Sequence, residues 1–175
     1  MDLSEKDTRE KVIDPWLKED AGWREEYIKR EVNSVKSDFV TSQYTEKISK
    51  GKEEGRFIDY LLLNVRKRPL AIIEAKRFSL DAEKGSIQAT TYQKDIESQT
   101  KVAVPIFMTN GKKWFFKEKG YPTREISGPF SQEDLQRKVQ LASERQNLAN
   151  TKVDPKIVDR SRNVEVVKQV LDHLN

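Results

Sequence analysis

Two apolar runs in the middle of the chain give its clearest structural signal. RFIDYLLLNV (56–65) and LAIIEAKR (70–77) are rich in aliphatic residues, and the basic segment RKRP (66–69) separates them. Runs that are apolar at neighbouring positions are typical of strands buried on both faces of a sheet. Pro69 cannot donate a backbone hydrogen bond and is therefore expected in the turn. The pattern predicts a buried β-hairpin.

The other apolar positions predict helices and further strands around this hairpin. Asn110-Gly111 is a strong turn signal between two strands, and Ile87, Tyr92 and Ile96 are expected on related faces of one helix. The order of elements is that of an α/β protein with a central mixed sheet flanked by helices. Helices are expected over 4–21, 81–100, 131–148 and 160–174, and strands over 27–32, 102–110, 112–118 and 123–130.

Local signals mark where some of these helices begin. Ser4 fits the capping box of the first helix, and Asp81 is a candidate N-cap for the helix over 81–100. Asp14-Pro15 has the form of a cap followed by proline at a first helical position. We therefore expect a kink or a restart within the first helix.

Composition narrows the class of protein. Charged residues make up 35% of the chain and hydrophobic residues another 35%. That hydrophobic content is enough for one buried core. The chain has no cysteine and one histidine, which excludes disulfides and cysteine catalysis and argues against histidine-rich zinc sites. Because no apolar run approaches the roughly 18–20 residues of a membrane helix, no membrane partner is expected.

Three charged residues interrupt the apolar hairpin. Burying an unpaired charge is costly, so Asp59, Glu74 and Lys76 each need a partner or a metal. If the hairpin is symmetric about Arg66-Lys67, Asp59 lies directly opposite Glu74 on one face. Lys76, two residues beyond Glu74, shares that face. A slip of one residue in the register would separate the two carboxylates.

Two carboxylates this close repel each other unless a cation or a shared proton lies between them. An oxygen-rich site without histidine or cysteine suits Mg²⁺ or Mn²⁺, with Asp59, Glu74 and the backbone carbonyl of Ala75 as ligands. Lys76 would orient or deprotonate the attacking water or balance phosphate charge, and burial and a nearby metal would lower its pKa. These are the parts of metal-assisted phosphodiester hydrolysis. The alternative is a partly solvated ion pair between Glu74 and Lys76.

The helix that follows the second hairpin strand adds two polar residues. Gln88 and Tyr92 are four residues apart and share a face, which can lie over the carboxylates. The alternative is a half-buried tyrosine beside a solvated glutamine.

Taken together, these residues resemble a known family. Asp59, then Glu74-Ala75-Lys76, then QATTY (88–92) is similar to the PD-(D/E)xK nuclease signature with its trailing QxxxY motif. More specifically, the chain resembles the N-terminal nuclease domain of type I restriction enzyme restriction (R) subunits. SEKDTREKVIDPWLKEDAGW, FMTNGKKWFF and TREISGPFSQEDL are also similar to stretches of that family. Ile58 stands where the superfamily has its proline.

The resemblance implies a restriction-endonuclease-like fold and a Mg²⁺-dependent endodeoxyribonuclease, the cleavage module of a type I restriction-modification enzyme. It also implies an acidic residue near the metal from the first helix, either Glu5 or Glu10, and a supporting or DNA-positioning role for Gln88 and Tyr92. The nuclease domain is expected over 1–148, and a linker and helix leading toward a motor domain over 149–175. The chain has no G-x-x-x-x-G-K-[ST], so ATP would act only through motor domains outside it.

The expected partners are double-stranded DNA and the modification and specificity subunits of a restriction complex, in the cytoplasm of a prokaryote. Residues 47–77 hold nine Lys and Arg against four Asp and Glu. Phosphate contacts are expected from Arg66, Lys67, Arg68, Lys112 and Lys113, although basic turns can also be ordinary solvated loops. Two other functions remain open: a stand-alone repair nuclease or junction resolvase of the same fold, and a catalytically silent DNA-binding or docking module.

Overall fold

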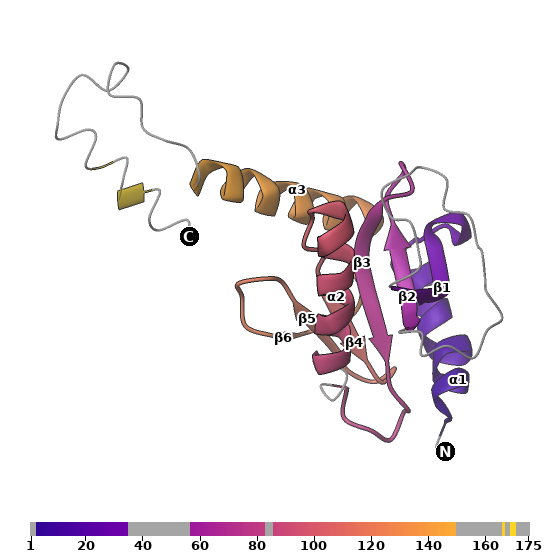
Figure 1. Cartoon of the computed structure of the whole chain (residues 1–175). Helices are drawn as coiled ribbons and strands as arrows, with labels where there is room; N and C mark the ends of the chain where they lie inside the picture. The colour runs from indigo at the N-terminus through magenta and orange to yellow at the C-terminus, as the bar shows by residue number, and fades with distance from the viewer. Residues whose placement is uncertain (1–2, 35–56, 83–85, 150–165, 167–168, 171–175) are drawn as a thin grey trace. The chain divides into compact units, whose positions relative to one another are not determined.

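A computed structural model describes residues 3–34, 57–82, 86–149, 166 and 169–170 (Figure 1). Most of the expected helix over 160–174 lies outside the described residues. The chain divides into two compact units, Met1–Gln136 and Arg137–Asn175. The first unit contains the sheet and the candidate site.

One mixed sheet forms the centre of the first unit. Its spatial order follows the chain from β1 to β6, and every neighbouring pair is antiparallel except β3 and β4, which are parallel. The predicted mixed sheet is thus confirmed. The strands are β1 (Ile28–Asn33), β2 (Phe57–Leu63), β3 (Pro69–Ala75), β4 (Ile106–Thr109), β5 (Trp114–Lys117) and β6 (Arg124–Ile126).

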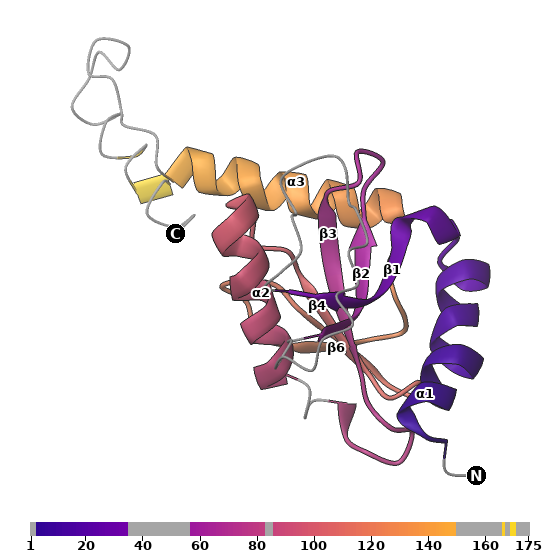
Figure 2. The same cartoon turned by 45° about the vertical axis from the view of Figure 1, so that its right-hand side comes forward.

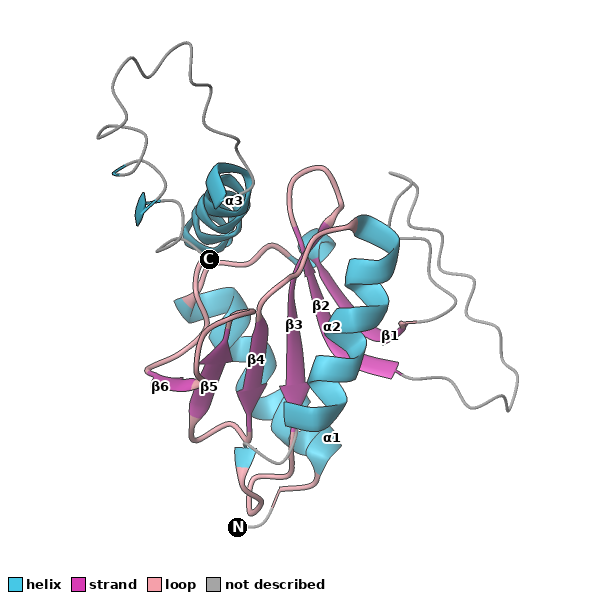
Figure 3. Cartoon of the chain, turned by 60° about the vertical axis from the view of Figure 1, so that its left-hand side comes forward, coloured by secondary structure: helices cyan, strands magenta, loops and turns pink. Residues whose placement is uncertain are grey.

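Helices lie on both faces of this sheet. Helix α2 (Ser86–Thr100) connects β3 to β4, the crossover that a parallel pair requires. The N-terminal helical segment lies on the opposite face from α2 (Figures 2 and 3). A 3₁₀ turn, η3 (Glu25–Tyr27), leads into β1, and α3 (Gln132–Ala149) follows β6.

The N-terminal helical segment comprises α1 (Glu5–Thr8) and the wider π-type turns η1 (Arg9–Ile13) and η2 (Trp16–Asp20). Ser4 caps it as predicted, because its hydroxyl accepts a hydrogen bond from the Asp7 N–H at 3.0 Å. Of the expected kink or restart, the restart is wrong, since Asp14 and Pro15 both keep right-handed helical angles. Pro15, which has no N–H, lies between the two wider turns.

The described part of α2 begins at Ser86, and residues 83–85, between it and the candidate N-cap Asp81, lie outside the described residues, so that cap stays a prediction. Ile87, expected on a face related to that of Tyr92 and Ile96, is instead 85% exposed. Tyr92 and Ile96 are buried as expected and pack with Leu61 of β2. Ile87 and Ile96 are about two and a half helical turns apart, so they lie on opposite sides of α2, and Ile96 is the one that faces the sheet.

The β2–β3 hairpin has the predicted register. Tyr60 lies opposite Ile73, and the next two pairs toward the turn keep that register before it shifts between Leu62 and Leu63. Pro69 is the first residue of β3, not part of the turn, a place where its missing N–H is tolerated. Every residue of β3 is buried, which agrees with its continuous apolar pattern.

Candidate active site

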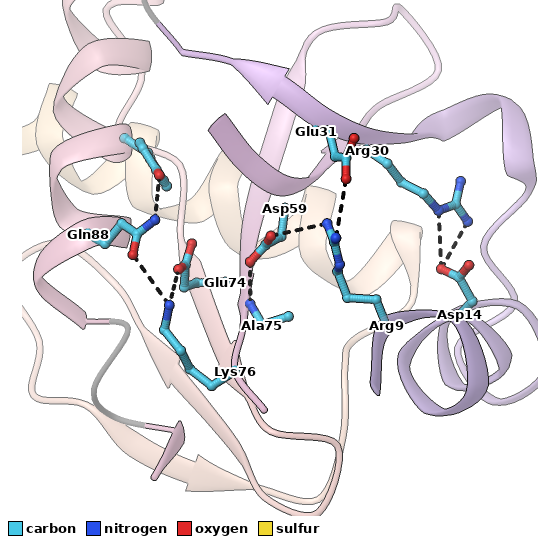
Figure 4. Close-up of polar contacts among 10 residues, drawn as sticks. Arg9, Asp14, Arg30, Glu31, Asp59, Glu74, Ala75, Lys76 and Gln88 are labelled. Carbon is cyan, nitrogen blue, oxygen red and sulfur yellow. Dashed lines mark hydrogen bonds and ion pairs between the residues drawn. The ribbon is translucent and has the colours of Figure 1, made fainter. Parts of the chain in front are cut away.

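The candidate site lies where β2 and β3 separate. Pairing between these strands ends at Tyr60 and Ile73, whereas β2 remains paired with β1 as far as Phe57. Asp59 is therefore one residue beyond the last β2–β3 pair, across from Glu74. Its Oδ2 accepts a hydrogen bond from the Ala75 N–H at 2.8 Å, so the carboxylate takes the place of a ladder partner between the strands (Figure 4).

Glu74 is the most deeply buried charged group of the site. Its side chain is 1% exposed, and its Oε1 lies 2.6 Å from the Lys76 ammonium. Its Oε2 is buried with no hydrogen-bond partner among the residues that the structure describes. Burial, reinforced by the negative charge of Asp59, raises the pKa of Glu74 to about 7. This carboxylate can therefore gain or lose a proton near neutral pH.

Lys76 connects the carboxylates to α2. Its ammonium donates to Glu74 and, at 3.3 Å, to the side-chain oxygen of Gln88, whose amide nitrogen donates in turn to the Tyr92 hydroxyl at 2.6 Å (Figure 4). The structure thus brings Gln88 and Tyr92 to the face that holds Glu74 and Lys76. Burial lowers the pKa of Lys76, as expected, but its hydrogen bond to Glu74 and the negative charges of Glu74, Glu5 and Asp59 together outweigh that effect, and the net shift is upward. The expected further lowering of this pKa by a bound metal stays a prediction.

Asp59 has a cationic neighbour, Arg9, that the sequence alone does not predict. Arg9 Nη1 lies 3.3 Å from Asp59 Oδ1, and Arg9 Nη2 lies 3.2 Å from Glu31 Oε1. Burial raises the pKa of Asp59, and the Ala75 N–H and the Arg9 charge partly offset this rise. Arg9 is 50 residues from Asp59 in the chain, so no local pattern signals the contact.

The structure separates the two candidate acids of the first helix. The charge of Glu5 raises the pKa of both Asp59 and Glu74, so Glu5 is near the site. Glu10 is exposed and pairs with Lys6 at 3.8 Å. Glu5 and Arg9 are four residues apart and share a face of the helix, whereas Glu10 is one residue further round. Of the two acids, Glu5 is the one whose charge acts on Asp59 and Glu74.

The donor set is small for a metal centre. Within the described ranges, no group of three His, Cys, Asp or Glu side chains is arranged to hold a metal ion. Mg²⁺, however, commonly takes only one or two carboxylates and completes its octahedron with water and phosphate oxygens. Asp59, Glu74 and the Ala75 carbonyl fit that pattern, and the unpartnered Oε2 of Glu74 within the described part of the chain is an oxygen that a cation would satisfy.

The predicted phosphate contacts fall into two places. Arg66, Lys67 and Arg68 occupy the β2–β3 turn, at the opposite end of these strands from Asp59 and Glu74. In that turn, Lys67 Nζ donates to the backbone oxygen of Glu26 at 3.0 Å.

The second basic pair lies nearer the carboxylates. Lys112 and Lys113 follow β4, whose last residue, Thr109, is paired with Ala75. The Lys112 ammonium lies 4.0 Å from the centre of the Phe78 ring, and Lys113 pairs with Glu125 at 3.6 Å. Of the predicted phosphate contacts, these two are at the same end of the sheet as the site.

Comparison with known proteins identifies a fold relative. No family model and no curated protein matches the chain. A solved structure does match: the fragment assigned as an HsdR subunit of a type I restriction enzyme from Vibrio vulnificus YJ016, with a TM-score of 0.61 and 24% identity. The chain shares the fold of that fragment. The match covers 83% of this chain and 27% of the Vibrio chain.

This likeness confirms a type I R-subunit-like α/β fold, as the sequence resemblance implied. The chain spans about a quarter of the length of its relative, since 27% of that chain is covered. In the described part of the chain, we find no helix with the length and apolar character needed to cross a membrane.

The raised pKa of Glu74 predicts how stability changes with pH in the metal-free protein. Its folded-state pKa of about 7 lies above its ordinary value of 4.5. At a pH between these two values, the folded chain therefore keeps a proton that the unfolded chain has lost. The contribution of Glu74 to the free energy of unfolding should therefore be largest below pH 4.5 and fall as pH rises to about 7. A shift of this size corresponds to about 3 kcal/mol.

Glu74→Gln should remove this part of the pH dependence, because glutamine resembles the protonated acid. Urea unfolding in a chelator at several pH values provides the measurement, with the exposed Glu19→Gln as matched control. Wild-type and Glu74→Gln curves that remain parallel between pH 4.5 and 7 would contradict the assignment.

Proposed function

We propose that this chain is a metal-dependent DNA endonuclease module, the cleavage domain of a type I restriction-modification enzyme. The observation that carries the proposal is the Oε2 of Glu74, buried without a partner in the described part of the chain, next to Asp59 where β2 and β3 separate. A buried carboxylate oxygen that lacks a donor is costly in a folded protein. A divalent cation between the two carboxylates would remove that cost and their mutual repulsion.

The residues present fit Mg²⁺ or Mn²⁺ better than a softer metal, because all the candidate ligands are oxygens. Asp59 and Glu74 would bind it through their carboxylates, and Ala75 through its backbone carbonyl. When bound, the ion would supply Lewis-acid polarisation of the scissile phosphate and a water of lowered pKa. The acid proton that Glu74 holds near neutral pH would leave when this ligand set forms.

Lys76 serves in this proposal as a positively charged donor. Its raised pKa keeps the ammonium protonated, which supports a role in orienting the attacking water and stabilising negative charge on the phosphate. Gln88, on α2, accepts a hydrogen bond from this ammonium, and the Tyr92 hydroxyl accepts a hydrogen bond from Gln88. The two α2 residues therefore position Lys76 and the DNA backbone and are not proposed as metal ligands.

The wider assignment is supported by the fold of the Vibrio vulnificus HsdR fragment. By that likeness we propose double-stranded DNA as the substrate, and modification and specificity subunits as partners in a prokaryotic cytoplasm. ATP would act through motor domains outside this chain. Lys112 and Lys113 are the proposed phosphate contacts closest to the cleavage site, since they follow the strand that pairs with Ala75.

Crystals of the chain soaked in Mn²⁺ provide the direct test of the metal site. Data collected at the manganese absorption edge should show one anomalous peak between the carboxylates of Asp59 and Glu74. Crystals of Glu74→Gln soaked in the same way are the control and should lack that peak. A wild-type crystal without the peak at saturating Mn²⁺, or with manganese only at surface acids, would overturn the proposal.

A further inference from the structure

Arg9 bridges two carboxylates beside the proposed metal site. Its two terminal nitrogens contact different acids, Asp59 at 3.3 Å and Glu31 at 3.2 Å (Figure 4). The Arg9 side chain is 19% exposed, whereas that of Glu31 is 69% exposed. The guanidinium thus has one partner inside the site and another toward solvent.

The two oxygens of Asp59 are held differently. Oδ2 accepts from the Ala75 N–H at 2.8 Å, a normal hydrogen-bond length that anchors the carboxylate to β3. Oδ1 faces Arg9 at 3.3 Å, a longer contact. Oδ1, the oxygen without a backbone hydrogen bond, is therefore the more available one for a cation, and it is the oxygen that faces Arg9.

Glu31 provides Arg9 with a second partner. It lies in β1 between Arg30 and Val32, which pair with Tyr60 and Ile58, so it is the β1 residue across from Asp59. Its backbone φ of 54° is in the left-handed region, which is uncommon for a residue with a side chain. The backbone is thus held in a costly conformation at the position that presents a carboxylate to Arg9.

We infer that Arg9 competes with the divalent ion for Asp59: it contacts both Asp59 Oδ1 and Glu31 in the metal-free protein and keeps only its contact with Glu31 when the metal binds. This inference rests on the proposed metal site. Arg9 acts here as a positioning residue, because it neutralises Asp59 while the site is empty of metal and keeps the carboxylate aligned with Ala75. Once the ion is bound, repulsion between two cations favours the contact with Glu31.

Competition predicts that losing Arg9 strengthens metal binding. Groups just outside the ligands of a metal commonly change its affinity by about 10–100-fold, and we expect Arg9→Ala to tighten Mn²⁺ binding by roughly tenfold. Glu31→Gln should have the opposite effect, a weakening by several-fold, because Arg9 loses the partner that it keeps when the metal binds. In Arg9→Ala/Glu31→Gln, the second substitution should add almost nothing, since Glu31 acts through Arg9.

The experiment is calorimetric titration of Mn²⁺ into the full chain for the wild type, the two single variants and the double variant. Lys6→Ala is the matched control: it removes a positive charge from the same helix, and Lys6 is an exposed partner of Glu10. Urea unfolding in a chelator establishes that each variant is folded, and Arg9→Gln replaces Arg9→Ala if the latter does not fold.

Tighter binding in Arg9→Ala, unchanged binding in Lys6→Ala and a Glu31→Gln effect that vanishes without Arg9 would establish the competition. If the wild type binds Mn²⁺ and Arg9→Ala binds it equally or more weakly, the competition is wrong and the metal site stands. An effect of Glu31→Gln that persists in the double variant would also overturn it. If neither the wild type nor Arg9→Ala binds Mn²⁺, the metal site is wrong and the inference falls with it.

Discussion

Lys76→Met is expected to abolish DNA cleavage while leaving the metal site intact. Methionine keeps an unbranched apolar stem of similar length, so the packing beside β3 is retained and only the ammonium is lost. Removing a charged donor from the developing charge of a transition state typically costs roughly 10²–10³-fold in rate. Metal affinity should be unchanged or higher, because a cation 2.6 Å from the Glu74 carboxylate is gone.

The measurement pairs Mn²⁺ titration of the chain with plasmid cleavage by the complete restriction enzyme that carries the same substitution. ATP hydrolysis by that enzyme should be nearly normal, since the proposed motor lies outside this chain. Lys18→Met is the matched control: Lys18 pairs with Glu25 at a partly exposed position on the N-terminal helical segment. Cleavage by Lys76→Met at the wild-type rate would reduce Lys76 to an ion-pair partner of Glu74.

Asp59→Asn is expected to eliminate metal binding without unfolding the protein. Asparagine keeps an oxygen that can accept the hydrogen bond from the Ala75 N–H, so that the buried donor is not left unsatisfied. The negative charge that would bind the cation is lost. Because groups outside a metal's ligands already change affinity by about 10–100-fold, loss of a ligand should weaken binding by more than about 100-fold.

Thermal unfolding with and without Mn²⁺ provides an independent measurement. The wild-type melting temperature should rise with Mn²⁺, because a ligand that binds only the folded state stabilises it, and that of Asp59→Asn should not. Glu19→Gln, an exposed substitution at the far end of the N-terminal helical segment, should behave like the wild type. An equal Mn²⁺-dependent rise in Asp59→Asn would remove Asp59 from the metal site.

The hairpin and its acidic pair were predictable from the sequence because their determinants are local. Two apolar runs and a short basic turn define a β-hairpin, and the symmetry of the turn places Asp59 across from Glu74, as the register of Tyr60 and Ile73 confirms. Helix capping by Ser4 was predictable for the same reason, since a cap acts within one turn of helix. The mixed sheet follows from the helix between β3 and β4, which permits their parallel pairing.

Predictions from local sequence were wrong where the conformation of a segment depends on contacts with other parts of the chain. A cap and proline at Asp14-Pro15 suggested a restart, but the helix continues through them with wider turns on either side. The missing N–H of Pro69 predicts a place in the turn, yet Pro69 is the first residue of β3, a position that tolerates this loss. Ile87 is exposed because it lies on the opposite side of α2 from Ile96, which packs against the sheet.

The electrostatics of the site were decided only by the tertiary structure. The sequence by itself determined which charged residues interrupt buried strands, and hence that Asp59, Glu74 and Lys76 need partners. It did not determine that Arg9 lies beside Asp59, because that contact joins residues 50 positions apart across two elements. The upward pKa shifts of Glu74 and Lys76 likewise depend on burial and on distances between side chains, which exist only once the strands and helices have packed.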